Sequence, residues 1–149
     1  MSRRRARELS FHMIFENESS GISAREMTDR YFSDDYLSSL SEECSVFSKI
    51  IEDDQKEYLL KSVEGVIDKK EDLESYIDKY SVGWNVSRIS TVSRSLIKLC
   101  MYEIKYMNIP VGASVNEALE LVKKYDNGEA VPFVNGVLAG FIKNEINND

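Results

Sequence analysis

Apolar residues recur at helical spacing along almost the whole chain, and this periodicity constrains the fold more than any other feature of the sequence. Ala6, Leu9 and Met13 form one stripe and predict a helix over residues 3–16. Apolar side chains also step by threes, fours and sevens across residues 47–80, which predicts one long helix or two abutting helices. With only seven glycines and two prolines in 149 residues, turn formers are too few for a sheet of short strands. An all-α fold is therefore expected.

Helix-start signals divide the rest of the chain into further helices. Residues 23–26 have the Ser-x-x-Glu pattern of a capping box, and a second box begins at Ser114. Ser90 is a predicted N-cap, and Pro132 is expected in the first turn of a last helix. The Ser-rich and acidic segment from about 33 to 45 indicates a long, mobile connection. Together these signals predict a compact domain of six to seven helices around one core.

Glycine and the turn formers near the C-terminus have structural interpretations. Residues 126–128, Asp-Asn-Gly, predict a turn between two helices. Gly136 follows Asn135 within the last predicted helix, where a missing side chain lets two helices approach closely. We therefore expect Gly136 to serve packing and not ligand binding.

Charge is distributed unevenly over a chain whose net charge is −7. The first thirty residues and residues 81–110 are net basic, whereas residues 31–80 and 111–149 are net acidic. A negative net charge argues against a nucleic-acid partner, but the two cationic zones favour one. The densest group of cations is formed by Arg3, Arg4, Arg5 and Arg7.

The four arginines are predicted to face water from the first turns of a helix, away from Leu9 and Met13. Guanidinium groups so close together repel one another, and each offers a fork of donors that matches phosphate oxygens. A solubilising or disordered tail is the alternative interpretation of such a basic run. Since the run lies on a helix in phase with a core stripe, in an otherwise acidic chain, we favour RNA binding. No recognition-helix pattern for duplex DNA is present.

Two aromatic residues are candidates for base stacking, which contributes about 1–3 kcal/mol per base in single-strand sites. Tyr80 lies at a predicted helix end, and Phe133 lies next to Pro132 at a predicted helix start. Taken alone, each position is more typical of a core residue.

The sequence lacks the parts of a metal site or a catalytic site. His12 is the only histidine, and Cys44 and Cys100 are far apart, which is typical of two buried thiols in a reducing compartment. There is no glycine-rich phosphate loop, no export signal and no apolar run of the ~20 residues that span a bilayer. We expect a cytoplasmic protein that is not an enzyme and needs no cofactor.

Six motifs, in this order and spacing, resemble NusB-type transcription antitermination factors. The resemblance covers nearly the whole chain and is weakest between about 17 and 72. Its most specific parts are the last two motifs. The motifs are Arg3–Glu8, Arg88-Ile89 with Val92 and Arg94, Tyr102–Ile104, Ile109-Pro110, Val115–Tyr125 and Phe133–Leu138.

The resemblance implies a fold of two small helical bundles, with subdomains at about 1–80 and 81–149 of a single domain over residues 1–149. It implies binding of the single-stranded boxA element of ribosomal-RNA leader transcripts. It also implies a partnership with ribosomal protein S-ten (NusE) in an RNA polymerase antitermination complex. A monomer and a homodimer are both compatible with it.

The resemblance also implies roles for individual residues. The RNA contacts of the family map onto Arg3, Arg4, Arg5, Arg7, Tyr80, Glu129 and Phe133, and the ribosomal-protein contacts map onto Phe15, Ser93 and Arg94.

Three positions depart from the pattern of the family. Many relatives carry an acid at the position of Ser93, a lysine at Pro132 and an aspartate at Ala139. RNA binding is therefore expected to depend more on the N-terminal arginines than it does in relatives.

Two other classes of function are compatible with such a helical chain. The first is a protein-only helical adaptor or regulatory subunit in ribosome biogenesis, whose arginines bind an acidic partner. The second is an enzyme subunit, because NusB-like domains also occur fused to ribosomal-RNA methyltransferases. The chain has no motif of a catalytic domain, which argues against the second class.

Overall fold

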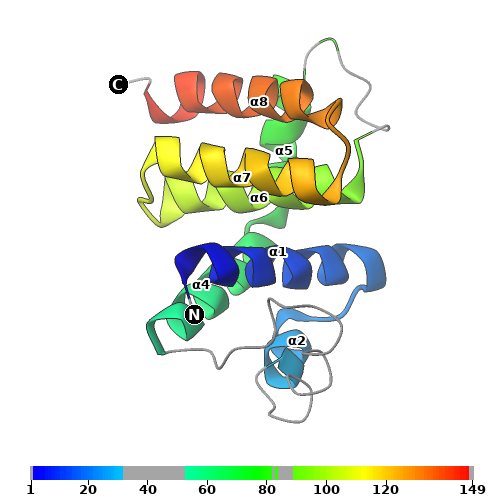
Figure 1. The fold of residues 1–149 in the computed structure, drawn as a ribbon, viewed down its shortest axis with the longest axis vertical. Coiled ribbons are helices and arrows are strands. Elements are labelled where there is room, and N and C mark those ends of the chain that lie inside the picture. The colour runs from blue at the N-terminus through cyan, green and yellow to red at the C-terminus, as the bar shows by residue number, and fades with distance from the viewer. Residues whose placement is uncertain (1, 32–52, 82, 84–88, 148–149) are drawn as a thin grey trace. The chain divides into compact units, whose positions relative to one another are not determined.

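The structure is a computed structural model, and it describes residues 2–31, 53–81, 83 and 89–147 (Figure 1). In these residues the regular elements are seven α-helices and a short terminal π-helix, with no strand, which confirms the all-α fold class. None of these helices is long and apolar enough to cross a membrane. The helices are α1 (Arg3–Ser20), α2 (Ala24–Tyr31), α4 (Asp53–Asp68), α5 (Lys70–Tyr80), α6 (Thr91–Tyr106), α7 (Val111–Tyr125) and α8 (Ala130–Phe141), followed by η3 (Ile142–Ile146).

The chain divides into two compact units, Met1–Ile67 and Asp68–Asp149. The division falls inside the stretch 47–80, where the periodicity allowed one helix or two. Two helices are present in its described part, because the α-helix is interrupted at Lys69 between α4 and α5. As a result α5 belongs to the second unit and not to the N-terminal subdomain expected over about 1–80.

In the first unit, α1 buries the predicted apolar stripe. Ala6, Leu9 and Met13 are fully buried. The hydroxyls of Ser10 in α1 and Ser62 in α4 lie 2.7 Å apart and share a buried hydrogen bond. A hydroxyl pair of this kind satisfies both buried groups, so the two helices can pack without an unpaired polar atom there.

A local hydrogen bond fixes each end of the α1–α2 connection. Gly21 has a φ of 77° and donates its N–H to the Asn17 carbonyl, as a left-handed C-cap does. At the start of α2, the Glu26 N–H donates to Ser23 Oγ at 3.2 Å, which confirms the predicted helix start. The predicted connection at 33–45 lies outside the described residues.

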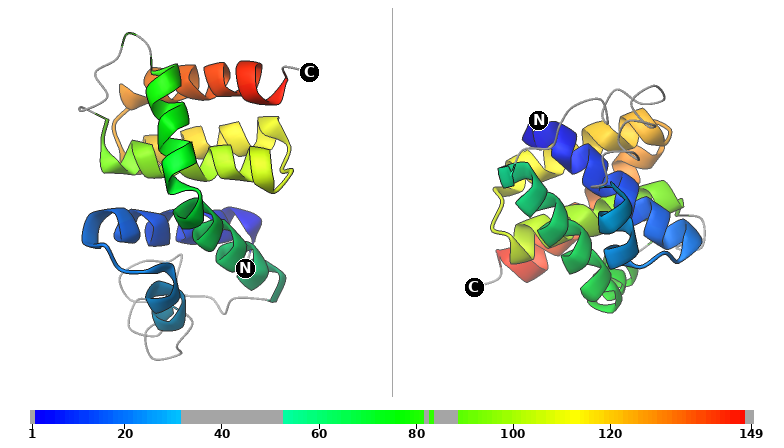
Figure 2. Two further views of the ribbon diagram at one scale, coloured as in Figure 1. Left: turned by 180° about the vertical axis from the view of Figure 1, so that it is seen from behind. Right: turned by 90° about the horizontal axis from the view of Figure 1, so that it is seen from below.

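In the second unit, α6, α7 and α8 run side by side, and α5 crosses α6 and α8 (Figure 1 and Figure 2). These three helices therefore pack against one another as a bundle, and the fourth lies across α6 and α8. The buried apolar residues of this unit come from all four helices and include Leu73, Ile77, Leu96, Leu99, Cys100, Val122, Val134, Val137, Leu138 and Phe141.

One charged pair accompanies this apolar core. Lys98 of α6 has no exposed side-chain surface, and its Nζ lies 2.7 Å from Glu74 Oε1 of α5. The Glu74 side chain remains about one-third exposed. The carboxylate therefore supplies the charge and the acceptor that a buried ammonium requires.

Of the helix starts predicted at Ser90 and Ser114, the first is confirmed and the second is wrong. The Ser93 N–H donates to Ser90 Oγ at 3.0 Å, so Ser90 caps α6 as predicted. The capping box at Ser114 is wrong, because α7 begins at Val111 directly after Pro110. Proline fixes the backbone at the N-cap position, and Ser114 is left inside the first turn.

The Ser114 side chain has a packing role. It is fully buried, and its hydroxyl donates to Cys100 Sγ at 3.3 Å. The Cys100 thiol is buried, as expected, while Cys44 lies outside the described residues.

The predicted turn at 126–128 is present, and Asn127 organises the start of α8. Its Oδ1 accepts hydrogen bonds from the N–H groups of Glu129 and Ala130, at 3.0 and 3.2 Å. Pro132 occupies the first turn of α8, as predicted.

The prediction for Gly136 is wrong. Gly136 is exposed, and a Cβ added there meets nothing within 4 Å. Close packing occurs one helical turn later, at Gly140, where an added Cβ lies 3.1 Å from Tyr80 Cδ1. Helix α8 carries both glycines, and only the second faces α5.

Candidate nucleic-acid interface

The arginine cluster occupies the start of α1. Ser2 caps this helix, with its Oγ accepting the Arg5 N–H at 3.2 Å, and the first turn contains no acidic residue. The N-terminus of a helix already carries partial positive charge, so cations placed there destabilise it and a bound anion stabilises it. These cations are therefore unfavourable for the helix dipole, whereas a bound anion at this position is favourable.

The arginines differ in their exposure. Arg3 and Arg4 are exposed, as predicted, and Arg5 is half-buried. The prediction that Arg7 faces water is wrong, since its exposed fraction is 6%. Burial on α1 is not limited to one stripe, because six consecutive residues, 6–11, are all buried. The Arg7 guanidinium lies 6.0 Å from the centre of the Tyr58 ring, inside the first unit.

Two residues of α4 position Arg3. Its Nε donates to Gln55 Oε1 at 2.9 Å, and its guanidinium carbon lies 4.3 Å from the centre of the Tyr58 ring. Both groups are uncharged, so they orient the guanidinium without neutralising it. Arg3 is thus an oriented cation that can still attract a phosphate.

Tyr80 is the last residue of α5 and belongs to the second unit. It is half-buried, with its ring against Gly140, and its hydroxyl donates to Glu145 Oε2 at 2.5 Å. The same carboxylate oxygen lies 3.6 Å from Lys79 Nζ. Tyr80 therefore keeps part of its ring surface accessible while its hydroxyl is fixed.

The pKa values of Glu145, Tyr80 and Lys79 shift in the directions expected when a carboxylate accepts a hydrogen bond and lies beside a cation. The hydrogen bond from Tyr80 and the charges of Lys79 and Lys105 lower the pKa of Glu145. Burial and the hydrogen bond to Glu145 raise the pKa of the Tyr80 hydroxyl. Hydrogen bonding to Tyr80 and the charge of Glu145 raise the pKa of Lys79.

The expectation of an exposed stacking ring at Phe133 is wrong. Phe133 is only 6% exposed, because it falls on the buried side of α8 together with Val134 and Val137. Glu129, by contrast, is exposed at the N-cap position of the same helix. Phe133 therefore stabilises the start of α8 by packing. Glu129 is the one of these two residues that is accessible to a ligand.

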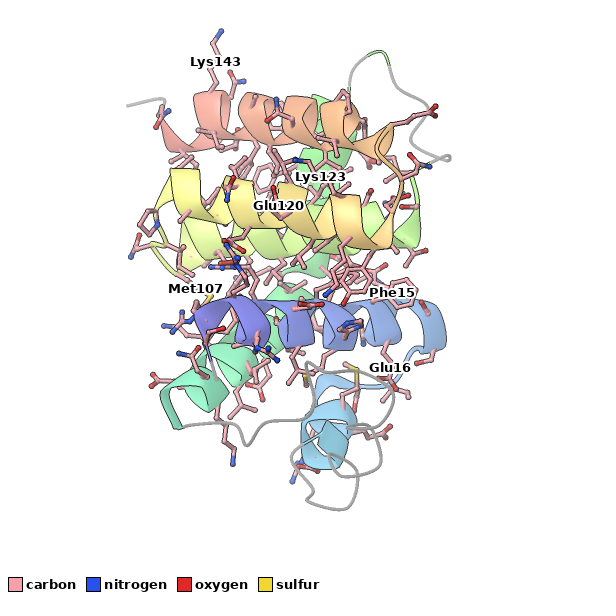
Figure 3. The ribbon with its side chains drawn as sticks, viewed as in Figure 1. Phe15, Glu16, Met107, Glu120, Lys123 and Lys143 are labelled. Carbon is pink, nitrogen blue, oxygen red and sulfur yellow. The ribbon has the colours of Figure 1, made fainter. Side chains whose placement is uncertain are left out.

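The expected partner-binding residues also differ in accessibility. Phe15 of α1 is half-buried, with its ring 6.2 Å from that of Phe11 (Figure 3). Arg94 of α6 is half-buried as well, but Ser93 is only 2% exposed. The Ser93 hydroxyl donates to Asp126 Oδ2 at 2.6 Å. This bond inside the second unit argues against a direct contact of the Ser93 side chain with a partner.

The sequence did not reveal the residues that position Arg3 and Tyr80. Gln55 and Tyr58 have no motif, although their spacing of three places them on one face of a helix. Lys79 could have been noticed beside Tyr80. Glu145 follows Tyr80 by 65 residues, so only the packing of α8 and η3 on α5 brings the two together.

Comparison with known proteins gives matches over the whole chain. Residues 4–143 match the model of the NusB family. A Ruminiclostridium cellulolyticum protein is 35% identical over 147 residues, covering 98% of this chain and 92% of its own. A Clostridium botulinum protein is 31% identical over 143 residues, with 95% and 100% covered. A Thermoanaerobacter protein is 37% identical over 92 residues, 62% of this chain and 66% of its own. All three are called transcription antitermination protein NusB.

Solved structures agree with this result. T. maritima NusB has a TM-score of 0.72 and 26% identity, covering 97% of this chain and 92% of its own. A chain from a crystal structure described as that of a plectonemic RNA supercoil has a TM-score of 0.80 at 26% identity, with both chains fully covered. On the evidence of its sequence and its helical fold, this chain belongs to the NusB family.

Proposed function

We propose that this chain is a transcription antitermination factor that binds a boxA-like single-stranded RNA together with ribosomal protein S-ten (NusE). It acts in the cytoplasm as part of an RNA polymerase antitermination complex, and it catalyses no reaction. The observation that carries the proposal is the group of arginines at the start of α1, where they oppose the helix dipole. Family membership and the likeness to a chain from an RNA-containing crystal structure support it.

Arg3, Arg4 and Arg5 supply the phosphate contacts in this proposal. Their guanidinium groups are exposed or half-exposed within one turn of a capped helix. A flexible single strand can bring successive phosphates to such a short cluster, whereas the acidic chain repels a long duplex. Arg7 has a supporting role, because its buried position beside Tyr58 limits its reach.

The second unit contributes base contacts. The half-exposed ring of Tyr80 offers a stacking surface, and the exposed carboxylate of Glu129 accepts hydrogen bonds from base amino groups. Phe133 maintains the helix start that presents Glu129. The S-ten partner contacts Phe15 and Arg94. Ser93 has a structural role, because its buried hydroxyl donates a hydrogen bond to Asp126.

The test is a fluorescence titration of a labelled boxA-like RNA, with a scrambled RNA of equal length as the control. Three arginine–phosphate contacts predict a slope of about −2 in a log–log plot of affinity against salt, from about 0.7 for each contact. Affinity for the boxA-like RNA should exceed that for the scrambled RNA, and addition of purified S-ten should increase it further.

Two outcomes of this titration would each identify an alternative to boxA recognition. Absence of RNA binding at low salt, combined with binding of S-ten, identifies a protein-only adaptor. A steep salt slope with equal affinity for both RNAs identifies a nonspecific cation cluster and contradicts boxA recognition.

A further inference from the structure

One carboxylate oxygen at the end of α5 gathers several donors. Glu145 Oε2 accepts the Tyr80 hydroxyl at 2.5 Å and lies 3.6 Å from Lys79 Nζ. Lys105 of α6 is close enough for its charge to lower the pKa of Glu145. All of these residues belong to the second unit. The Lys79 ammonium and the Tyr80 phenol at one carboxylate oxygen form an anion-binding position that the chain fills with its own side chain.

Lys105, whose charge reaches Glu145, is held by Tyr76 one helical turn before Tyr80 on α5. Its Nζ lies 2.7 Å from the Tyr76 hydroxyl, 4.9 Å from the centre of the Tyr76 ring and 5.8 Å from that of Tyr106. These contacts are with uncharged groups, so they orient the ammonium without cancelling its charge. The anion-binding position is therefore built before any external ligand arrives.

We propose that Lys79 and Tyr80 bind a phosphate group of single-stranded RNA, and that Glu145 competes with this phosphate for the same donors. The proposal rests on the RNA-binding function proposed above. It adds Lys79 to the RNA contacts of the second unit, and it makes the C-terminal helix η3 an internal competitor of RNA.

The location of Glu145 permits its displacement. It belongs to the five-residue helix η3, which has no buried residue. The Lys79 side chain is 63% exposed, and that of Glu145 is 19% exposed. Rotation of the carboxylate away from Tyr80 therefore exposes little apolar surface and does not open the core. A phosphodiester carries the same single negative charge and can replace the carboxylate at these donors.

The closing experiment compares Glu145→Gln with Glu120→Gln in titrations of a short boxA-like single-stranded RNA. Glutamine retains an oxygen that accepts the Tyr80 hydroxyl, so the fold is kept while the competing charge is removed. Glu120 is exposed on α7 and pairs with Lys123 at 3.4 Å, so its substitution removes the same charge from the same unit (Figure 3). We expect Glu145→Gln to bind the RNA about fivefold more tightly than the unchanged chain, and Glu120→Gln to differ by less than about twofold.

A second substitution tests the lysine. Adding Lys79→Gln to Glu145→Gln should remove most of the gain and reduce the salt slope by about 0.7, the value for one phosphate contact on a single strand. A gain that survives without Lys79 would overturn the assignment of this residue to phosphate.

The outcomes distinguish this inference from the proposed function. If the unchanged chain binds RNA and Glu145→Gln binds no better than Glu120→Gln, Glu145 is only a structural contact and the inference fails alone. If neither the unchanged chain nor Glu145→Gln binds RNA, both proposals fail. Binding by Glu145→Gln alone would support both and identify Glu145 as a strong competitor.

Discussion

Arg3 in the first unit and two lysines in the second unit have neighbours of different charge. In the first unit, the guanidinium of Arg3 contacts the amide of Gln55 and the ring of Tyr58. In the second unit, the ammonium groups of Lys98 and Lys79 face the carboxylates of Glu74 and Glu145. A cation beside neutral groups keeps its full attraction for phosphate, whereas a cation beside a carboxylate exerts it only after that carboxylate moves. The neighbours of a basic residue therefore decide its role in RNA binding as much as the residue itself does.

The sharpest test of this comparison is the triple substitution of Arg3, Arg4 and Arg5 by alanine. Loss of three phosphate contacts should weaken RNA binding about 100-fold at about 0.1 M salt. The melting temperature should stay nearly unchanged, because removal of cations that oppose the helix dipole offsets the loss of the Arg3 contacts with Gln55 and Tyr58. Titration and thermal unfolding monitored by circular dichroism measure the two effects.

A matched control removes three exposed lysines elsewhere. Lys61, Lys123 and Lys124 are all exposed, so their triple replacement by alanine alters the net charge equally. The comparison breaks down if this control loses as much RNA affinity as the arginine variant does.

The next largest effect concerns the buried pair in the second unit. Glu74→Gln removes the charge that faces the fully buried Lys98, and should lower the free energy of unfolding by about 2 kcal/mol. Urea unfolding measures this loss, and RNA affinity should stay unchanged. In the control Glu120→Gln, an exposed pair is broken and the loss should be below about 0.5 kcal/mol. Equal losses would contradict a structural role for the Lys98–Glu74 pair.

Two glycines of α8 give a smaller, paired effect near Tyr80. Gly136→Ala adds a methyl group to an open, exposed position and should stabilise the chain by about 0.5–1 kcal/mol through helix propensity. Gly140→Ala places the same group 3.1 Å from Tyr80 Cδ1, so the ring must shift. We expect Gly140→Ala to be less stable than Gly136→Ala by about 1 kcal/mol in urea unfolding. Equal stability would show that Tyr80 moves aside without strain.

The smallest expected effect is a dependence of stability on pH. Burial raises the pKa of Glu74, but the hydrogen bond and charge of Lys98 outweigh it, and the pKa is lowered below the ordinary 4.5. The unfolded chain therefore binds the proton first, and the stabilisation is present above about pH 4.5 and is lost as the pH falls through the lower folded pKa. Urea unfolding at about pH 7 and about pH 4 should show a smaller decline for Glu74→Gln than for the unchanged chain. An identical decline would exclude Glu74 as a source of the pH dependence.

Local patterns predicted most of the helical fold. The stripe of Ala6, Leu9 and Met13 and the cap at Ser90 depend on neighbours three or four residues away, so the sequence contains the whole signal. Ser114 was misread because Pro110 starts the same helix earlier, and a proline at the N-cap competes with a downstream capping box.

The candidate interface was less predictable, because exposure depends on contacts between distant segments. Arg7 and Phe133 have the residue types of an RNA site, but packing on other helices buries them. Gly136 and Gly140 are equivalent in sequence terms, and only the position of Tyr80 distinguishes them. Glu145 had no local signal at all, since its partners Lys79 and Tyr80 lie on α5.

The buried thiol of Cys100 offers a chemical reporter for one unit alone. Its side chain is 1% exposed and accepts a hydrogen bond from Ser114, so an alkylating reagent reaches it only when the second unit opens. In a Cys44→Ser background, the rate of alkylation measures how often that opening occurs. An RNA that binds to this unit would slow the alkylation of Cys100. An RNA bound only by the arginines of α1 would leave the alkylation rate unchanged.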